Sequence, residues 1–306
     1  VEPYEFRIVD SSQRIVIEAT LFDKSFNDTK EYPSDGRYFS VKLSRTSDVV
    51  NVRSEAVSYA TVVLVNEQGE EWTYGERSDT PGYYELIDDD FKAVSGVRYK
   101  LKIQTPDDEQ IESDWETLPD PSPPMGPIGF RETTTQKILM NEVAEIEGVT
   151  PNITLPVNET GKPIYYQWKY LPTWIFVAAL ASTTDAMIKT CWASTPYYLR
   201  GYTVLQDTDG GYQKDFFFMD TRTNERILYE FSMLVQQEVL NEDYYYFRKE
   251  MQDRNQPGGV FSVPPYNLNT NYHSSAGKSV FGYFGVVREE AKRWYFNRND
   301  LSYGIS

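Results

Sequence analysis

The sequence contains one cysteine, Cys191, and one histidine, His273, and each scarcity excludes a class of site. A single cysteine cannot form a disulfide within the chain, and a cysteine nucleophile needs a nearby base such as histidine. Zinc sites use several cysteines and histidines at short spacings, which this chain lacks. We therefore expect Cys191, next to Trp192, to be a small buried hydrophobic residue, and we expect no cofactor.

Basic charge is also in short supply. The chain has 30 Lys and Arg against 46 Asp and Glu, a net charge of −16, and residues 1–120 alone hold 13 basic and 26 acidic residues. Nucleic acids and anionic lipid surfaces attract clustered Lys and Arg, so neither is an expected partner. The longest apolar run, "WIFVAALA" at 174–181, is too short to cross a membrane.

Aromatic residues, in contrast, make up 15% of the chain, which suits β-structure and binding surfaces. In residues 97–103, Val, Tyr, Leu and Ile alternate with Arg and Lys, a period of two that marks a half-buried strand. About seven such segments between residues 14 and 116, separated by turn residues, predict an immunoglobulin-like β-sandwich. We assign residues 1–117 to this acidic domain.

"LPDPSPPMGP" at 118–127 has five prolines in ten residues, which predicts an extended linker. We expect residues 128–306 to form a second β-rich domain, so the fold class is mainly β. In "VFGYFGVV" at 280–287 both faces are apolar, which indicates a strand covered on both sides, or one thinned by Gly282 and Gly285 so that another element can approach.

The clearest helix is "NEDYYYFRKEMQ", and we expect it to cover about 241–254 before "NQPGG" ends it. Asn241 is the expected N-cap, and acidic residues follow it at the positive end of the helix dipole. Helical spacing places Leu240, Tyr244, Phe247 and Met251 on one apolar stripe, with Tyr245 at its edge and Tyr246 on the far side.

The sequence contains no G-x-S-x-G, Walker loop, dinucleotide fingerprint or H-E-x-x-H motif. "DTDGG" at 207–211 resembles the start of a calcium loop but lacks the later ligands, so a polar turn is the favoured interpretation. Binding of a calcium ion in the Asp-rich turns is the alternative. Carboxylates are so numerous that nothing selects an acid–base pair, although a glycan-active hydrolase remains an alternative. We expect a protein that is not an enzyme.

Several ordered stretches resemble a known family. "FSVKLSRTS", "VSYATVVLVNEQGE", "GYYEL" and "VRYKLKIQTPDDEQIES" come before the proline-rich segment, and "YYQWKYLPTW", "CW", "RILYEFSMLVQQEVLNEDYYYFRKEMQDRNQPGGVFSVPP" and "VFGYFGVVREEAKRWYF" follow it. In this order they are similar to a family of Bacteroidota outer-membrane lipoproteins known as domain of unknown function 4249. The segment "NLNTNYH" departs from the family pattern.

The resemblance implies a lipid-anchored outer-membrane protein that acts as an accessory to a TonB-dependent transporter. The lipidated cysteine would stand immediately before Val1, and the opening "VEPYEF" is typical of a processed, mature product. Glu2 and Glu5 beside the anchor favour export to the cell surface, although the periplasmic face is not excluded. A subunit of an outer-membrane protein-assembly or export machine is the alternative.

The nearly neutral second domain, which holds many aromatic residues, is expected to make the larger contact with the β-barrel partner. The loop 266–273 is the preferred contact, because its Asn-rich composition suits neither strand nor helix. Burial in the core is the alternative for each single ring. The candidate partner-binding residues are Trp174, Phe176, Tyr197, Tyr198, Tyr246, Tyr266, Asn267, Asn269, Asn271, Tyr272 and His273.

Overall fold

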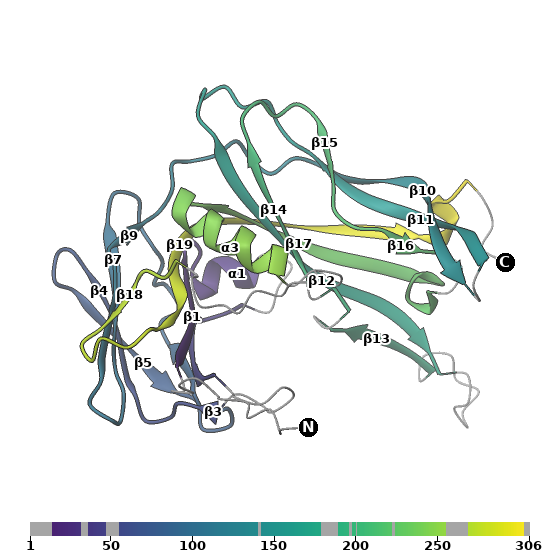
Figure 1. The fold of residues 1–306 in the computed structure, drawn as a ribbon. Coiled ribbons are helices and arrows are strands. Elements are labelled where there is room, and N and C mark those ends of the chain that lie inside the picture. Colours follow the sequence, from purple (N-terminus) through teal and green to yellow (C-terminus); the bar gives the residue numbers. More distant parts are fainter. Residues whose placement is uncertain are drawn as a thin grey trace, which may run out of the picture. The chain divides into compact units, whose positions relative to one another are not determined.

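The computed structural model of the chain is mainly β-structure, which confirms the predicted fold class (Figure 1). No helix in the part of the chain that the structure describes is long and apolar enough to cross a membrane. The structure describes residues 14–31, 36–46, 55–139, 142–178, 189–195, 198–199, 201–221, 224–254 and 269–302.

The chain forms two compact units. Unit 1 comprises residues 1–119 and 241–288, and unit 2 comprises residues 120–240 and 289–306. The chain therefore passes between the units three times, whereas the sequence suggested two consecutive domains. Residues 241–288, expected in the second domain, belong to unit 1. Residues 118–127 contain no helix or strand, but Met125 is buried in the core of unit 2, so this segment is more than a linker.

Unit 1 is a sandwich of two sheets. One sheet orders β19, β1, β2 and β6, and the other orders β5, β4, β7, β8 and β18. β5 pairs with β4 through its first residues and with β6 through Gly75 and Glu76, so it joins the sheets. The elements are β1 (Ile15–Phe22), α1 (Phe26–Glu31), β2 (Phe39–Arg45), β3 (Glu55–Ala56), β4 (Thr61–Asn66), β5 (Glu71–Glu76), β6 (Tyr83–Leu86), β7 (Arg98–Gln104), β8 (Gln110–Ser113), β9 (Glu116–Thr117), α3 (Glu242–Arg254), β18 (Tyr272–Ser274) and the first part of β19 (Phe281–Asn297).

The core of unit 1 follows from the period of two in its strands. In β7 the predicted alternation is present: Tyr99, Leu101 and Ile103 are buried, while the intervening residues face outward. β1 alternates in the same way and pairs in parallel with β19, from Val16 opposite Phe281 to Phe22 opposite Val287. This parallel pair joins two segments that are far apart in the sequence.

Helix α3 confirms the predicted apolar stripe at Tyr244 and Phe247, while Met251 is only partly buried and Leu240 belongs to β17, before the helix. Tyr244, Tyr245 and Phe247 are buried, and Tyr246 is half exposed. The Tyr244 ring stacks on Tyr283 of β19 with the ring centroids 5.2 Å apart. A Cβ added to Gly285 would lie 2.3 Å from the Tyr244 ring, so this glycine makes room for the helix.

The other glycine in the same strand has a different role. Gly282 has φ +124°, and a Cβ there would lie 2.0 Å from the backbone oxygen of Ile17 in β1. Gly282 therefore allows the close approach of β19 to β1. Both glycines act as the sequence suggested, by letting another element come near the strand.

Unit 2 also consists of two sheets. β19, β17 and β12 form one sheet, with β13 and β14 on the far edge of β12, and β10 and β11 form the other, with β15 and β16 on β11. Trp168 and Phe231 are fully buried in the core of this unit. The elements are β10 (Ile128–Leu139), β11 (Glu142–Thr154), β12 (Ile164–Val177), β13 (Thr190–Ser194), β14 (Tyr202–Asp207), β15 (Gln213–Asp215), β16 (Met219–Asp220), η1 (Glu225–Ile227), β17 (Glu230–Leu240), the second part of β19 and η2 (Arg298–Asp300).

Pro172 lies inside β12, where a missing N–H removes one hydrogen bond of the ladder. On one side it faces Met233 of β17. On the other side the pairing with β14 stops at Lys169 and the pairing with β13 begins at Thr173. The proline therefore sits at the gap between two short edge strands, where its lost donor is tolerated.

Candidate functional site

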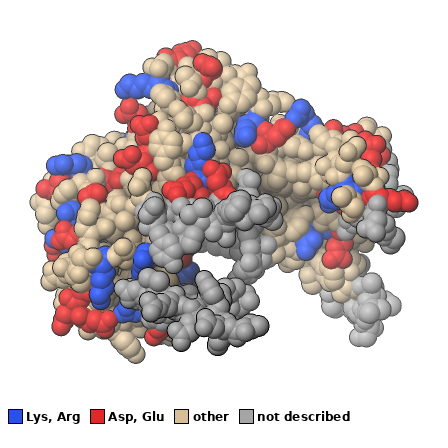
Figure 2. All heavy atoms as spheres, viewed as in Figure 1, with Lys and Arg blue, Asp and Glu red and all other residues tan. Residues whose placement is uncertain are grey.

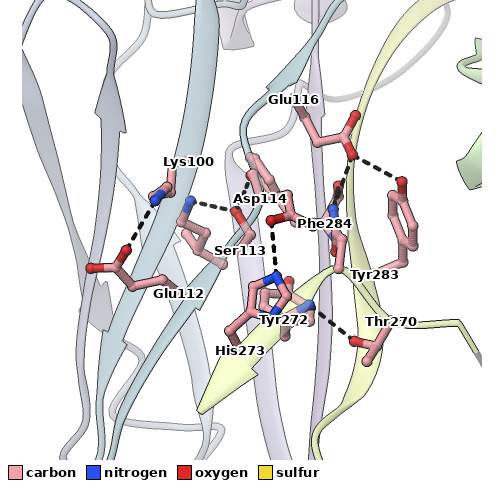
Figure 3. Close-up of polar contacts among 12 residues, drawn as sticks. Lys100, Glu112, Ser113, Asp114, Glu116, Thr270, Tyr272, His273, Tyr283 and Phe284 are labelled. Carbon is pink, nitrogen blue, oxygen red and sulfur yellow. Dashed lines mark hydrogen bonds and ion pairs between the residues drawn. The ribbon is translucent and has the colours of Figure 1, made fainter. Parts of the chain in front are cut away.

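A polar cluster surrounds Glu116 of β9 in unit 1 (Figure 3). Its Oε1 accepts hydrogen bonds from the Tyr283 hydroxyl at 2.9 Å and from the Asn271 amide at 3.0 Å. The Asn241 amide lies 3.4 Å from Oε2 and donates to the Thr117 carbonyl at 2.8 Å. Burial raises the pKa of Glu116, and the three donors oppose that rise. Asn241, the expected N-cap, thus uses its amide as a donor to β9.

Asn271 joins this cluster to β19. Its side chain accepts from the Phe284 N–H at 2.9 Å and donates to the Phe284 carbonyl at 3.0 Å, while its own carbonyl accepts from the Asp114 N–H at 2.7 Å. The residue is buried, so its polar groups are used inside the fold. Asn271 is therefore a structural clamp, and the expectation that it faces a partner is wrong.

Residues after Asn271 form an edge strand of the sandwich. Tyr272 is buried, and β18 pairs with β8 with Tyr272 opposite Ser113 and His273 opposite Glu112. His273 is exposed, and its Nε2 lies 2.9 Å from the Asp114 carboxylate (Figure 3). The prediction that this segment is a loop is wrong from Tyr272 onward, because these residues pair with β8 and the Tyr272 side chain packs in the core.

The remaining residues of the predicted loop fall into two groups. Asn269 is exposed, as a contact residue would be. Tyr266 and Asn267 lie outside the described residues, as does Tyr197 of the second predicted group. Of the loop, the structure leaves Asn269 and His273 as described residues with exposed side chains.

The aromatic candidates of unit 2 point in different directions. Trp174 is buried in the core, where its ring meets Tyr198 edge-on at 6.0 Å, and the Arg226 guanidinium lies over both rings. Phe176, two residues further along β12, is 47% exposed. Trp174 and Tyr198 thus support the fold, whereas Phe176 is available for a contact.

An open groove of about 470 Å³ lies on the face of β12 opposite to Trp174 and Phe176. Ile175 and Val177 of β12 and Leu228 give it an apolar floor. Trp192 of β13 is paired with Ile175, which places both side chains on one face, and Trp192 is 60% exposed. The groove is lined by Ile175, Val177, Thr190, Leu228, Tyr229, Glu230, Asn297, Arg298 and Asn299.

Polar groups and one more exposed ring surround this floor. Tyr229 is 48% exposed, and Glu230, Arg298 and Asn299 add a carboxylate, a guanidinium and an amide to the lining. Exposed aromatic rings around an apolar floor, with charged groups at the margin, match the composition of protein–protein interface centres. Sequence reasoning missed this groove, because only the pairing of β12 with β13 brings Trp192 beside Ile175.

Cys191 is exposed, so the expectation that it is buried is wrong. It faces away from the groove, because it pairs with Phe176 while Trp192 pairs with Ile175. The "DTDGG" segment forms a turn in which the Gly210 N–H donates to the Asp207 carboxylate at 3.1 Å. Among the described residues, no group of three His, Cys, Asp or Glu side chains could hold a metal ion.

On the face shown in Figure 2, Lys and Arg side chains are scattered among carboxylates and do not gather into one large basic patch. No curated protein matches the chain significantly in sequence. The sequence model of one family, described as "Domain of unknown function (DUF4249)", matches residues 1–293 of the 306. Since this match covers nearly the entire chain, the protein belongs to that family.

Proposed function

We propose that the protein is a non-enzymatic accessory subunit of an outer-membrane β-barrel, and specifically of a TonB-dependent transporter. A lipid on a cysteine before Val1 would anchor it, and the protein would face the cell surface. The observation that carries the proposal is the groove of unit 2, because two exposed aromatic rings, Tyr229 in its lining and Trp192 opposite Ile175, accompany its apolar side chains.

The groove suits an extended loop of the partner. Its apolar floor, formed by Ile175, Val177 and Leu228, would bury an aliphatic or aromatic side chain of that loop. Trp192 and Tyr229 would close over the contact and exclude water, as aromatic hot-spot residues do. Glu230 and Arg298 would pair with polar groups at the margin, where they set orientation more than affinity.

Co-purification from native membranes in mild detergent tests this function. The full-length protein should recover one β-barrel protein, and Trp192→Thr should weaken that association about thirtyfold, because a truncated hot-spot residue costs about 2 kcal/mol or more and each 1.4 kcal/mol is a factor of about ten. Tyr212→Thr is the matched control, since Tyr212 is 41% exposed between β14 and β15 of the same unit, beside the start of β12, whereas the groove lies at the end of that strand. Recovery of the wild-type protein as a monomer without a barrel would refute the accessory role.

Mass spectrometry of the recovered barrel distinguishes a transporter from a protein-assembly or export machine. Protease treatment of intact cells tests the location, and full protection of the protein would contradict exposure at the surface. Metabolic labelling with a fatty acid tests the anchor; an unlabelled protein would remove that part of the proposal.

A further inference from the structure

The hairpin of β10 and β11 is longer than the sheet that supports it. The two strands pair from Ile128 opposite Ile153 to Leu139 opposite Glu142, and Figure 1 shows them side by side. β16 and β15 pair with β11 only at residues 148–149 and 152–154. The Glu147 carbonyl still accepts from the Thr221 N–H, just after β16. Among the described strands, residues 142–146 pair with β10 alone, and the hairpin extends beyond its sheet as an arm.

The end of this arm is apolar and exposed. Ile138 and Val143 are opposite each other in the ladder, so their side chains share one face. They are 76% and 68% exposed. We call these two residues the tip pair. Ends of hairpins normally carry polar turn residues, and exposed apolar side chains there work against solubility unless they have a function.

The tip pair is not a continuation of the core of unit 2. On the same face, Ile153 and Val149 are fully buried at the base of the arm. Two polar cross-strand pairs then follow, Thr134 with Glu147 and Gln136 with Glu145, before the tip pair is reached. Six residues of strand separate Glu132, which is opposite Val149, from Ile138, a distance of about 20 Å. The apolar end is thus held away from the protein's own core.

Charge is distributed unequally between the two faces of the arm. The face of the tip pair carries Glu132, Glu145 and Glu147, and its positions between residues 132 and 149 include no Lys or Arg. Both carboxylate oxygens of Glu132 accept hydrogen bonds from Ser302, so Glu145, beside the tip pair, is the carboxylate that a partner would meet first. The basic residues Arg131 and Lys137 are on the opposite face, where they pair with Asp215 and Asp220. A surface that receives the tip pair would therefore also meet carboxylates.

We propose that the tip pair inserts into an apolar pocket with a basic rim on a partner protein. The two β-branched side chains supply the buried contact, and Glu145, the glutamate next to them on the same face, pairs with the rim. An anionic bilayer would be repelled by the glutamates of this face, which makes a protein the favoured occupant. This contact is separate from the groove and does not depend on the identity of the barrel.

Photo-crosslinking in the protein's own cells tests the proposal. The full-length protein carries p-benzoyl-phenylalanine in place of Ile138 or, in a second version, Val143. Both versions should give an adduct with one and the same protein, identified by mass spectrometry. Glu145→Lys should reduce the adduct from position 138 severalfold, because it places a positive charge opposite the basic rim. Position 157 is the control, since Val157 is an exposed valine of unit 2 outside the arm.

The outcomes separate the possible occupants. Adducts with lipid, or binding of the purified protein to phosphatidylethanolamine–phosphatidylglycerol vesicles that Ile138→Thr abolishes, would replace the protein partner with a membrane and overturn the proposal. Adducts no different from those at position 157, or an adduct unaffected by Glu145→Lys, would also overturn it. Thermal melts of Ile138→Thr should match the wild type, because threonine keeps the β-branch and the site is exposed. If the protein does not co-purify with a barrel but still forms the crosslinks at positions 138 and 143, that result would contradict the proposed accessory function and leave the contact of the tip pair supported.

Discussion

Replacing Asn271 with alanine should destabilise unit 1 strongly, although the residue lies in a segment that looks like a surface loop. The change removes both hydrogen bonds to the Phe284 backbone, at 2.9 and 3.0 Å, and the one to the Glu116 carboxylate at 3.0 Å. The Phe284 N–H and C=O are left buried without these partners, and such groups cost about 1–3 kcal/mol each. With the lost bond to the carboxylate, the free energy of unfolding should fall by about 3–5 kcal/mol.

Thermal unfolding of the purified protein, followed by circular dichroism, measures this loss. For a unit of this size, 1 kcal/mol corresponds to about 2–4 °C, so the transition of unit 1 should shift down by roughly 6–20 °C. Asn269→Ala is the matched control, because Asn269 is two residues away and exposed, and it should change the free energy by less than about 0.5 kcal/mol. If the two variants melt together, Asn271 is not a clamp and its role as a partner contact returns.

Two further predictions concern the same unit. Because burial raises the pKa of Glu116, this carboxyl keeps its proton to a higher pH in the folded protein than in the unfolded chain. Glu116 therefore lowers the free energy of unfolding as the pH rises from about 4.5 through the raised pKa. The melting temperature of Glu116→Gln relative to that of the wild type should increase between pH 4 and pH 8, and a constant difference would contradict the burial argument. Gly285→Val should lower the melting temperature by several degrees, because the new Cβ would lie 2.3 Å from the Tyr244 ring. Gly75→Val is the control and should leave the melting temperature unchanged, because a Cβ at Gly75 would have no neighbour within 4 Å. Equal melting temperatures would show that α3 does not pack tightly on β19.

Local elements of this fold could be read from the sequence. The period of two in residues 97–103 predicted the buried face of β7, and the spacing of Tyr244 and Phe247 predicted the face that α3 buries, with Tyr246 outside. Gly282 and Gly285 indicated that other elements approach their strand closely, as they do. These features depend on residues within one element, whose geometry sets which side chains share a face.

Partners between distant segments could not be read in the same way. The Asn-rich composition of residues 266–273 predicted a loop. In the structure β18 pairs with β8 and Tyr272 is buried, and the Asn271 side chain forms two hydrogen bonds with the Phe284 backbone. Cys191 was expected inside because cysteine is usually buried, yet it lies exposed on β13. Composition reports average preferences, and a particular contact overrides them.

The groove and the arm also depend on contacts between distant segments. The residues of the groove come from β12, β13, the segment that leads into β17, the end of β19 and η2, and no spacing in the sequence predicts that they meet. The tip pair of the arm is visible as two apolar residues in "KILMNEVAE", but its exposure depends on where β15 and β16 stop pairing with β11. Periodicity within a strand specifies which side chains face inward, because backbone geometry is local. Which strands become neighbours, and which apolar side chains remain uncovered, depends on how all segments together bury their surface, so those features became visible only in the folded chain.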